Sequence, residues 1–407
     1  MRILLSRDGW LLFATTGVRS FAYGFLSVVL GLYLDTVGVS ATAIGWIFTA
    51  ALAGGAAMTI LITLVADRYG RRTLLILGAA LMAIAGGVFA VADNPILLML
   101  AAIFGTISPS GKEVGPFLSI EQAILPQTTR PEKRTAVFAA YNFVGSLCGA
   151  FGALAVGIPS LFSLSQESGY RFLVWAYVVC AIVMMFLFSF LSPTVEVEGR
   201  TVLQPRKIGI LHSRSIVAKL AGLFALDAFA GGFIVQSIVA YWFYLRYAID
   251  LYGLGGIFFG TNFLAALSFL AAPAIARRFG LLNAMVFTHL PSNILLLAVP
   301  LMPSLELAIV MLLLRNLLSQ LDVPTRQSYT MAIVKPEERS ASAGILSVAR
   351  NTGAAIAPSF AGAILAVPSM GLPFILAGGL KIIYDLWIFG VFRKVKPPEE
   401  QPKIGRR

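Results

Sequence analysis

The sequence predicts an all-α membrane protein in which twelve transmembrane helices form two pseudo-symmetric six-helix bundles. Three observations lead to this fold class: a composition too apolar for water, apolar stretches of membrane-spanning length along the chain, and a pattern that repeats in the second half. Of the 407 residues, 58% are hydrophobic and only 12% are charged, whereas soluble domains carry about 25% charged residues. We therefore expect the lipid bilayer to be the main solvent of this chain.

Twelve stretches approach the roughly 20 apolar residues that a helix needs to cross hydrocarbon. The first follows Arg2 and Arg7 and lacks the small-residue cleavage site of a signal peptide, so we expect it to remain as a helix. Pro, Gly and charged residues separate the others. The predicted spans are 9–34, 41–66, 72–92, 95–126, 135–158, 171–192, 215–246, 250–276, 281–302, 304–333, 340–366 and 371–392.

The longest polar stretch lies between the sixth and seventh spans and predicts a linker between two bundles. The expected domains are a bundle at 1–192, a cytoplasmic linker at 193–214, a bundle at 215–392 and a basic tail at 393–407. Basic residues gather in alternate loops, which predicts that both termini are cytoplasmic. We expect the protein to lie in the plasma membrane. The net charge of +12 then follows from topology and from attraction to anionic lipid, and it indicates no nucleic-acid partner.

An internal repeat supports the two bundles. Three segments return in order: Phe-Ala-Tyr-Gly-Phe at 21–25 as Phe-Ala-Gly-Gly-Phe at 229–233, Ala-Asp-Arg-Tyr-Gly at 66–70 as Ala-Arg-Arg-Phe-Gly at 276–280, and Pro-Glu-Lys-Arg at 131–134 as Pro-Glu-Glu-Arg at 336–339. Their offsets are 208, 210 and 205 residues. Such a repeat implies two parallel halves with a solute site between them.

The loop between the second and third spans resembles the signature loop of the major facilitator superfamily, whose pattern is G-x-L-A-D-R-x-G-R-K/R. Thr63 replaces the first Gly, and the matching positions are Asp67, Arg68, Gly70, Arg71 and Arg72. The resemblance implies solute transport by alternating access. It also implies that the loop is a latch that stabilises the outward-facing state, with its arginines bound to the other half in one conformation.

A glycine-rich fifth span resembles a motif of the family's antiporter members. The glycines are Gly145, Gly149, Gly152 and Gly157, although Ala150 stands where that motif has Pro. This resemblance favours proton-coupled efflux by exchange, but small residues at such spacing also serve close helix packing. Proton-coupled uptake of an anionic nutrient and export of a metal or metalloid remain alternatives.

Ionisable residues within the spans are the candidates for function, because such groups are costly in hydrocarbon and persist mainly on cavity faces. They are Arg19, Lys112, Glu113, Glu121, Asp227, Arg315, Asp322, Arg326, Arg350, Lys381 and Asp385. Glu113 lies in a stretch rich in Gly and Pro at 108–116, where a broken helix frees backbone groups. We expect Glu113 and Asp227 to couple protons to transport.

The repeat suggests two pairs across the cavity. Arg19 and Asp227 occupy equivalent positions of the first and seventh spans, so we expect them to pair, unless each is neutralised within its own half. Glu121 and Arg326 are equivalent at an offset of 205 and would form a cytoplasmic gate, with Asp322 one turn from Arg326 as the competing partner.

A second set of polar residues is expected to line the substrate cavity. It consists of Arg19, Lys112, Asn142, Gln236 and Tyr241. The sequence contains no phosphate-binding G-x-x-x-x-G-K-S/T loop and no metal-ligand spacing, and His212 and His289 stand isolated. We therefore expect no enzyme activity, no cofactor and no metal site. The expected partners are a small solute, protons and lipid, and the expected state is a monomer.

Overall fold

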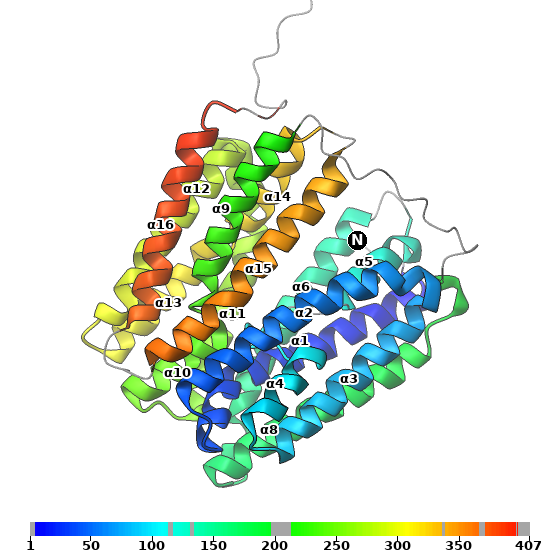
Figure 1. The fold of residues 1–407 in the computed structure, drawn as a ribbon, viewed down its shortest axis with the longest axis vertical. Coiled ribbons are helices and arrows are strands. Elements are labelled where there is room, and N and C mark those ends of the chain that lie inside the picture. The colour runs from blue at the N-terminus through cyan, green and yellow to red at the C-terminus, as the bar shows by residue number, and fades with distance from the viewer. Residues whose placement is uncertain are drawn as a thin grey trace, which may run out of the picture. The chain divides into compact units, whose positions relative to one another are not determined.

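The structure is a computed structural model that describes residues 5–112, 117–130, 134–196, 213–335, 338–365, 371–395 and 397 (Figure 1). Every regular element in these residues is a helix, which confirms the all-α prediction. Ten helical stretches of the described chain are long and apolar enough to cross a membrane. The protein is therefore a multi-pass membrane protein.

The first six predicted spans correspond to helices α1 to α8. These helices are α1 (Arg7–Thr36), α2 (Ala41–Tyr69), α3 (Arg71–Val91), α4 (Pro95–Phe104), α5 (Phe117–Ile124), α6 (Arg134–Leu154), α7 (Ile158–Leu161) and α8 (Gln166–Ser189). The fourth span is broken between α4 and α5, where Thr106 and Gly111 have φ angles of 52° and 67°. Pro109 lies in the same break, as the Gly- and Pro-rich sequence suggested.

The last six spans correspond to helices α9 to α16. They are α9 (Arg214–Gly232), α10 (Gln236–Tyr247), α11 (Leu251–Phe279), α12 (Leu281–Ala298), α13 (Leu305–Ser319), α14 (Asp322–Ile333), α15 (Arg339–Leu365) and α16 (Leu372–Phe392). The seventh and tenth spans are thus also broken, at 233–235 and 320–321. These two breaks were not predicted.

The chain forms two compact units that differ from the predicted domains. The first unit comprises Met1–Val202, Ile234–Phe263 and Ala355–Ser369, and the second comprises the rest. Residues 234–263 and 355–369, which the sequence assigned to the second bundle, thus group with the first. Direct bonds explain part of this grouping, because the Ser237 hydroxyl of α10 donates to the Ser27 carbonyl oxygen of α1 at 2.6 Å.

Close backbone contacts hold the first unit together. A Cβ atom on Gly24 of α1 would lie 2.1 Å from the Gly149 carbonyl oxygen of α6. One on Gly152 would lie equally close to the carbonyl oxygen of Phe21. The glycine-rich fifth span therefore serves close packing of α6 on α1, which is the ordinary use of small residues between membrane helices.

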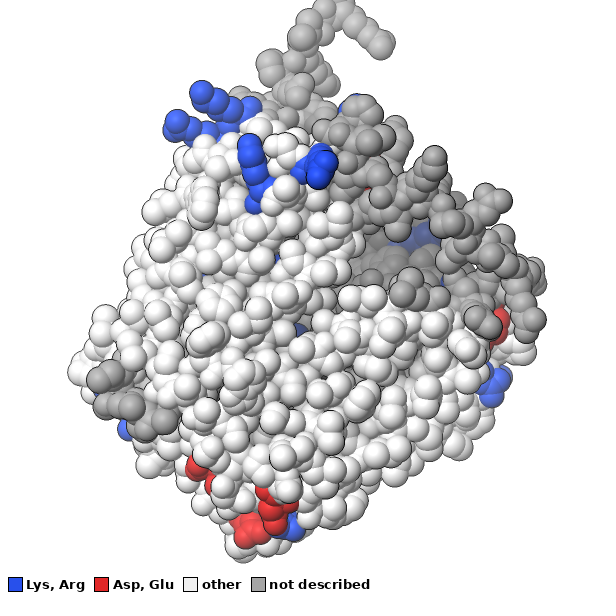
Figure 2. Space-filling view, viewed as in Figure 1, with Lys and Arg blue, Asp and Glu red and all other residues white. Residues whose placement is uncertain are grey.

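The second unit has a core at the meeting of α9, α12 and α16. Its buried apolar side chains include Leu220 and Phe224 of α9, Met285 of α12, and Tyr384 and Ile388 of α16. Figure 1 shows α12 and α16 running side by side. On the face drawn in Figure 2, the charged side chains of the described residues gather mainly near the edges, and the surface between them is largely uncharged. Lipid contact requires such a surface.

Candidate functional site

The first unit buries one ion pair, between Arg19 of α1 and Glu121 of α5. Both side chains have no exposed surface, and Arg19 donates to the two carboxylate oxygens at 2.6 and 3.0 Å. Thr15 donates to the same carboxylate at 3.1 Å, and the Tyr141 hydroxyl donates to it as well. The Phe117 ring lies 4.9 Å from the guanidinium carbon. Four donor contacts from three side chains thus neutralise and satisfy the Glu121 carboxylate.

The second unit buries the equivalent pair with its charges reversed. Asp227 of α9 accepts a bond from Arg326 of α14 at 3.0 Å. Arg19 and Glu121 are the repeat equivalents of these two residues, and each pair closes inside its own unit. Each charge is thus neutralised by a short bond inside its own unit, which is the alternative stated for Arg19 and Asp227. The cytoplasmic gate between Glu121 and Arg326 stays a prediction.

Asp227 is the centre of a larger network. Its Oδ1 atom lies 2.5 Å from Lys381 Nζ and 4.0 Å from His289 Nε2, and its Oδ2 atom lies 3.5 Å from Arg350. Only 5% of the Asp227 side chain is exposed. We call this network the charge cluster, and its members are Asp227, His289, Arg315, Asp322, Arg326, Arg350, Lys381 and Asp385.

His289 connects Asp227 to a second carboxylate. Its Nδ1 atom lies 2.8 Å from Asp385 Oδ1, and Asn293 donates to Asp385 Oδ2 at 2.8 Å. His289 is 5% exposed and Asp385 is 1% exposed. The expectation that His289 stands isolated was therefore wrong. Spacing gave a usable signal, because His289 and Asn293 on α12, and Lys381 and Asp385 on α16, are each four residues apart and share a helix face.

The break in the tenth span separates Arg315 from Asp322 and Arg326. Asp322 and Arg326 form the expected pair one turn apart in α14, at 3.0 Å. Arg315 lies in α13, before the break, and not on a helix continuous with α14. Its buried Nε atom has no hydrogen-bond partner among the described residues. Arg315 interacts electrostatically with Asp227 and Asp322, so it belongs to the same cluster.

The two units differ in the number of buried charges. At the repeat offsets of 205, 208 and 210 residues, the equivalents of His289, Arg315, Arg350 and Asp385 carry no acidic, basic or His residue, and Lys381 has a basic equivalent only at 210, the exposed Arg171. Among the described residues, the second unit thus buries more charged groups than the first. These additional groups form the candidate functional site.

The hydrogen bonds described for the signature loop lie within its own unit. Gly70 has a φ angle of 93°, a left-handed conformation that favours glycine. The Glu196 carboxylate accepts the backbone N–H groups of Arg71 and Arg72 at 2.7 and 3.1 Å, at the positive N-terminus of α3. The two arginine side chains donate to carbonyl oxygens at and just beyond the end of α8. The sequence analysis did not identify Glu196 as the partner of this loop.

The structure does not describe the side chains of three expected residues, Asp67, Arg68 and Glu113. Glu113 lies outside the described residues. The backbone of Asp67 and Arg68 belongs to α2, but their side chains lie outside what the structure describes.

Two of the expected cavity residues, Gln236 and Tyr241, lie on α10 and form hydrogen bonds with α1. Gln236 donates to Ser27 at 2.9 Å, and the Tyr241 hydroxyl donates to Asp35 at 2.8 Å. Asn142 is exposed on α6. Lys112 is exposed in the break of the fourth span.

Two helix breaks meet in the first unit. The N–H of Ser237, at the start of α10, donates to the carbonyl oxygen of Pro109, in the break between α4 and α5, at 3.0 Å. Breaks in membrane helices are tolerated where the freed backbone groups find partners in protein or in a cavity. Here the carbonyl group freed in one break accepts a hydrogen bond from the N–H group freed beside the other.

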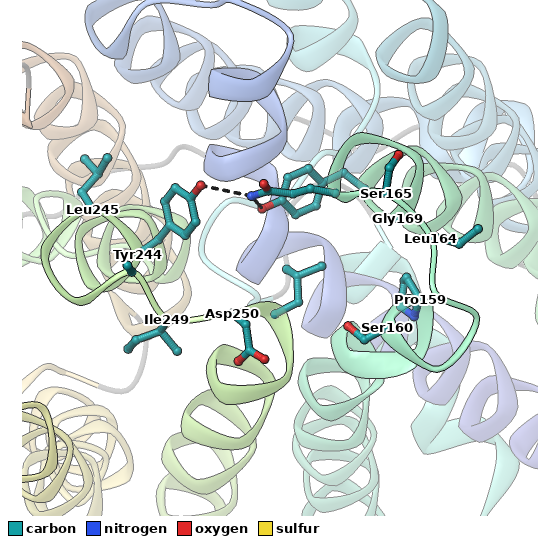
Figure 3. Close-up of a pocket in the computed structure, with 13 residues that line it drawn as sticks. Pro159, Ser160, Leu164, Ser165, Gly169, Tyr244, Leu245, Ile249 and Asp250 are labelled. Atoms are coloured by element: carbon teal, nitrogen blue, oxygen red, sulfur yellow. Dashed lines mark hydrogen bonds between the residues drawn. The ribbon is translucent and has the colours of Figure 1, made fainter.

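The first unit also contains a pocket of about 580 Å³, lined by residues of α7, α8, α10 and the start of α11 (Figure 3). Gln166 donates to the hydroxyls of Tyr170 and Tyr244 at 2.9 and 3.1 Å. Asp250 lies at its edge and caps α11 through the N–H of Gly253. None of the residues that line this pocket belongs to the charge cluster.

Comparison with known proteins agrees with this architecture. The chain is 29% identical over 432 aligned positions to the uncharacterized membrane protein YJR124C of Saccharomyces cerevisiae, with 96% of each chain covered. It is similar in structure to the nucleoside transporter NupG, with a TM-score of 0.74 at 13% identity, covering 95% of this chain and 100% of that one. A D-xylose–proton symporter gives a TM-score of 0.71 at 14% identity, covering 96% and 98%. The family model of the Major Facilitator Superfamily matches residues 12–320. The chain therefore belongs to the Major Facilitator Superfamily and has the transporter fold of that family.

Proposed function

We propose that this protein is a proton-coupled secondary active transporter that moves a small solute across the plasma membrane by alternating access. The observation that carries the proposal is the placement of His289 between two carboxylates in the buried charge cluster. Histidine is the side chain whose charge changes most readily near neutral pH. Ionisable groups inside membrane proteins commonly mark proton pathways. We further propose that both termini are cytoplasmic and that the monomer is the working unit.

The geometry suggests how protonation of His289 could change the bonds between the helices. A neutral imidazole holds one proton, on Nδ1 or Nε2, and a second proton would let it donate to Asp385 and attract Asp227 at once. That added charge competes with Lys381 for Asp227 Oδ1, which both groups face. Since His289, Lys381 and Asp227 lie on α12, α16 and α9, a change in their bonding would bias how these helices pack. Coupling of this kind commonly amounts to about 1–3 kcal/mol.

Two directions of transport follow from different observations. The glycine-rich fifth span suggested proton-coupled efflux by exchange, and we retain efflux as the first candidate. Those glycines have a sufficient explanation in the packing of α6 on α1, however. The positive excess of the charge cluster favours a second candidate, uptake of an anion together with protons.

The test uses purified protein in liposomes that contain a pH-sensitive dye. A panel of nucleosides, sugars, organic anions, lipophilic cations, arsenite and divalent metals is applied on one side, and proton movement is recorded. His289→Gln retains a side chain that can hydrogen-bond Asp385 but does not titrate. Glu167→Gln alters an exposed ion pair with Arg171 and serves as the control.

We expect the parent and Glu167→Gln to move protons with a solute, and His289→Gln to lose proton-driven accumulation while it still exchanges solute at equal concentrations. Accumulation against a gradient by His289→Gln at the parental level would refute the proton role of this residue. The direction of dye response with the active solute separates exchange from cotransport.

A further inference from the structure

We infer that the transported solute is an anion, a carboxylate or a phosphate, and that Arg350 is the side chain that binds it. This inference rests on the proposed function, because it assigns the solute of the same site. Its basis is the geometry of the cluster. Among the described residues joined by ion pairs, the carboxylates are Asp227, Asp322 and Asp385, and the permanent cations are Arg326, Arg350 and Lys381. Arg315, whose buried Nε atom has no hydrogen-bond partner among the described residues, is a further cation for which a solute anion would supply a counter-ion.

Arg350 is more accessible than the two other cations that bond Asp227. Its side chain is 35% exposed, whereas those of Arg326 and Lys381 are 8% and 10% exposed. Its contact with Asp227 is 3.5 Å, and it shares that Oδ2 atom with Arg326 at 3.0 Å. Of the cations bound to Asp227, Arg350 is thus the one that an incoming anion can reach, and it can change partners without leaving Asp227 unpaired.

The chemistry of the guanidinium group suits such a ligand. Its donors form a planar fork that can bind both oxygens of a carboxylate or phosphate. Arg315 adds a second donor in the cluster, because its buried Nε atom finds no hydrogen-bond partner among the described residues. A buried donor without a partner is uncommon, and an absent ligand is one explanation for it.

Arg19, the buried basic residue described in the first unit, is not available to bind an anion. Arg19 is fully buried and is bound to both oxygens of Glu121. Lys112 is exposed in a helix break of the first unit and is not a member of the cluster. We therefore assign the anion to Arg350, and not to Arg19 or Lys112, which the sequence analysis placed in the substrate cavity.

The experiment measures ligand-induced thermal stabilisation of the purified protein in detergent, using probe pairs that differ in charge alone as far as possible. The pairs are succinate with succinamide, benzoate with benzamide, and glucose 6-phosphate with glucose. The variants are Arg350→Gln, Arg350→Lys and, as the control, Arg339→Gln, which removes an exposed charge from the start of the same helix. Apparent affinities come from titration of each probe.

We expect at least one anion to stabilise the parent and the Arg339→Gln variant more than its uncharged partner does. Arg350→Gln should weaken that binding by about tenfold to a hundredfold, as the loss of a charge-assisted hydrogen bond implies. Arg350→Lys should retain part of it, which also shows that the site is folded. Equal stabilisation by charged and uncharged probes, or unchanged anion affinity in Arg350→Gln, would overturn the inference.

The same preparations separate this inference from the proposed function. If an uncharged or cationic solute moved protons in a His289-dependent way, proton coupling would stand and the anion assignment would fall. If anions bound through Arg350 but no solute moved protons, the anion site would stand and proton coupling would fall.

Discussion

Removing the acidic member of the buried pair in the first unit should destabilise the protein strongly. In Glu121→Gln the amide oxygen can replace only one of the two carboxylate oxygens that accept from Thr15 and Tyr141, and the NH2 group must donate to the other hydroxyl. Arg19 remains fully buried without a counter-ion. Breaking a buried ion pair by removing one partner costs about 3–5 kcal/mol. That cost corresponds to a change of roughly two to four orders of magnitude in the unfolding equilibrium constant.

A double variant shows whether the unpaired charge is the cause. Arg19→Met combined with Glu121→Gln removes both charges and keeps most of the side-chain volume, and buried pairs replaced in this way are often close to neutral in stability. The assay is denaturant unfolding in detergent, followed by tryptophan fluorescence. An exposed pair supplies the baseline, since Glu167→Gln should cost less than about 1 kcal/mol. A double variant as unstable as Glu121→Gln alone would contradict the reasoning.

Three further predictions concern the first unit. Gly24→Ala should cost about 1–3 kcal/mol, because its methyl group would lie 2.1 Å from a carbonyl oxygen of α6, whereas Gly87→Ala, with no atom within 4 Å, should be neutral or slightly stabilising in the same unfolding assay. Glu196→Gln removes the negative charge at the N-terminus of α3 and should lower the free energy of unfolding by about 0.3–2 kcal/mol. This loss of stability should be smaller in high salt, and an equal loss at all salt concentrations would contradict an electrostatic origin. Tyr241→Phe should cost about 0.5–1.5 kcal/mol through its lost bond to Asp35 and should speed hydrogen exchange in α10, and unchanged exchange there would show that this bond does not hold the helix.

Most of the fold could be predicted because long apolar runs end at clear signals. The third span was placed at 72–92 and is α3 at Arg71–Val91, beginning after Gly70 in a left-handed conformation. The break of the fourth span was marked by Pro109 and Gly111. The break of the seventh span, Phe-Ile-Val at 233–235, directly follows Gly231 and Gly232, but the sequence analysis used these glycines only for the repeat. A tertiary bond at the start of α10 accompanies it, and local sequence does not contain that information.

Most members of the site could be predicted from the sequence, but the contacts between them could not. Asp227, Arg326 and Lys381 were identified as intramembrane charges, and their distances show that they converge. The repeat was used to pair equivalent residues between halves, although equivalent residues make equivalent contacts inside each half. His289 was missed because its partner Asp385 lies 96 residues away in the sequence. Only the shared four-residue spacing on two helices could have indicated this contact.

The reversed polarity of the two equivalent ion pairs limits the route by which the halves could have diverged. If both descend from one duplicated segment, a change of one member at a time to the opposite sign would have placed two like charges in contact, at separations of 2.6 to 3.0 Å in the present pairs. Such an intermediate is strongly disfavoured in a buried site. A tolerated path would have passed through a stage in which at least one position was uncharged. Reconstructed ancestral sequences of the two halves should therefore contain an uncharged residue at one of these positions.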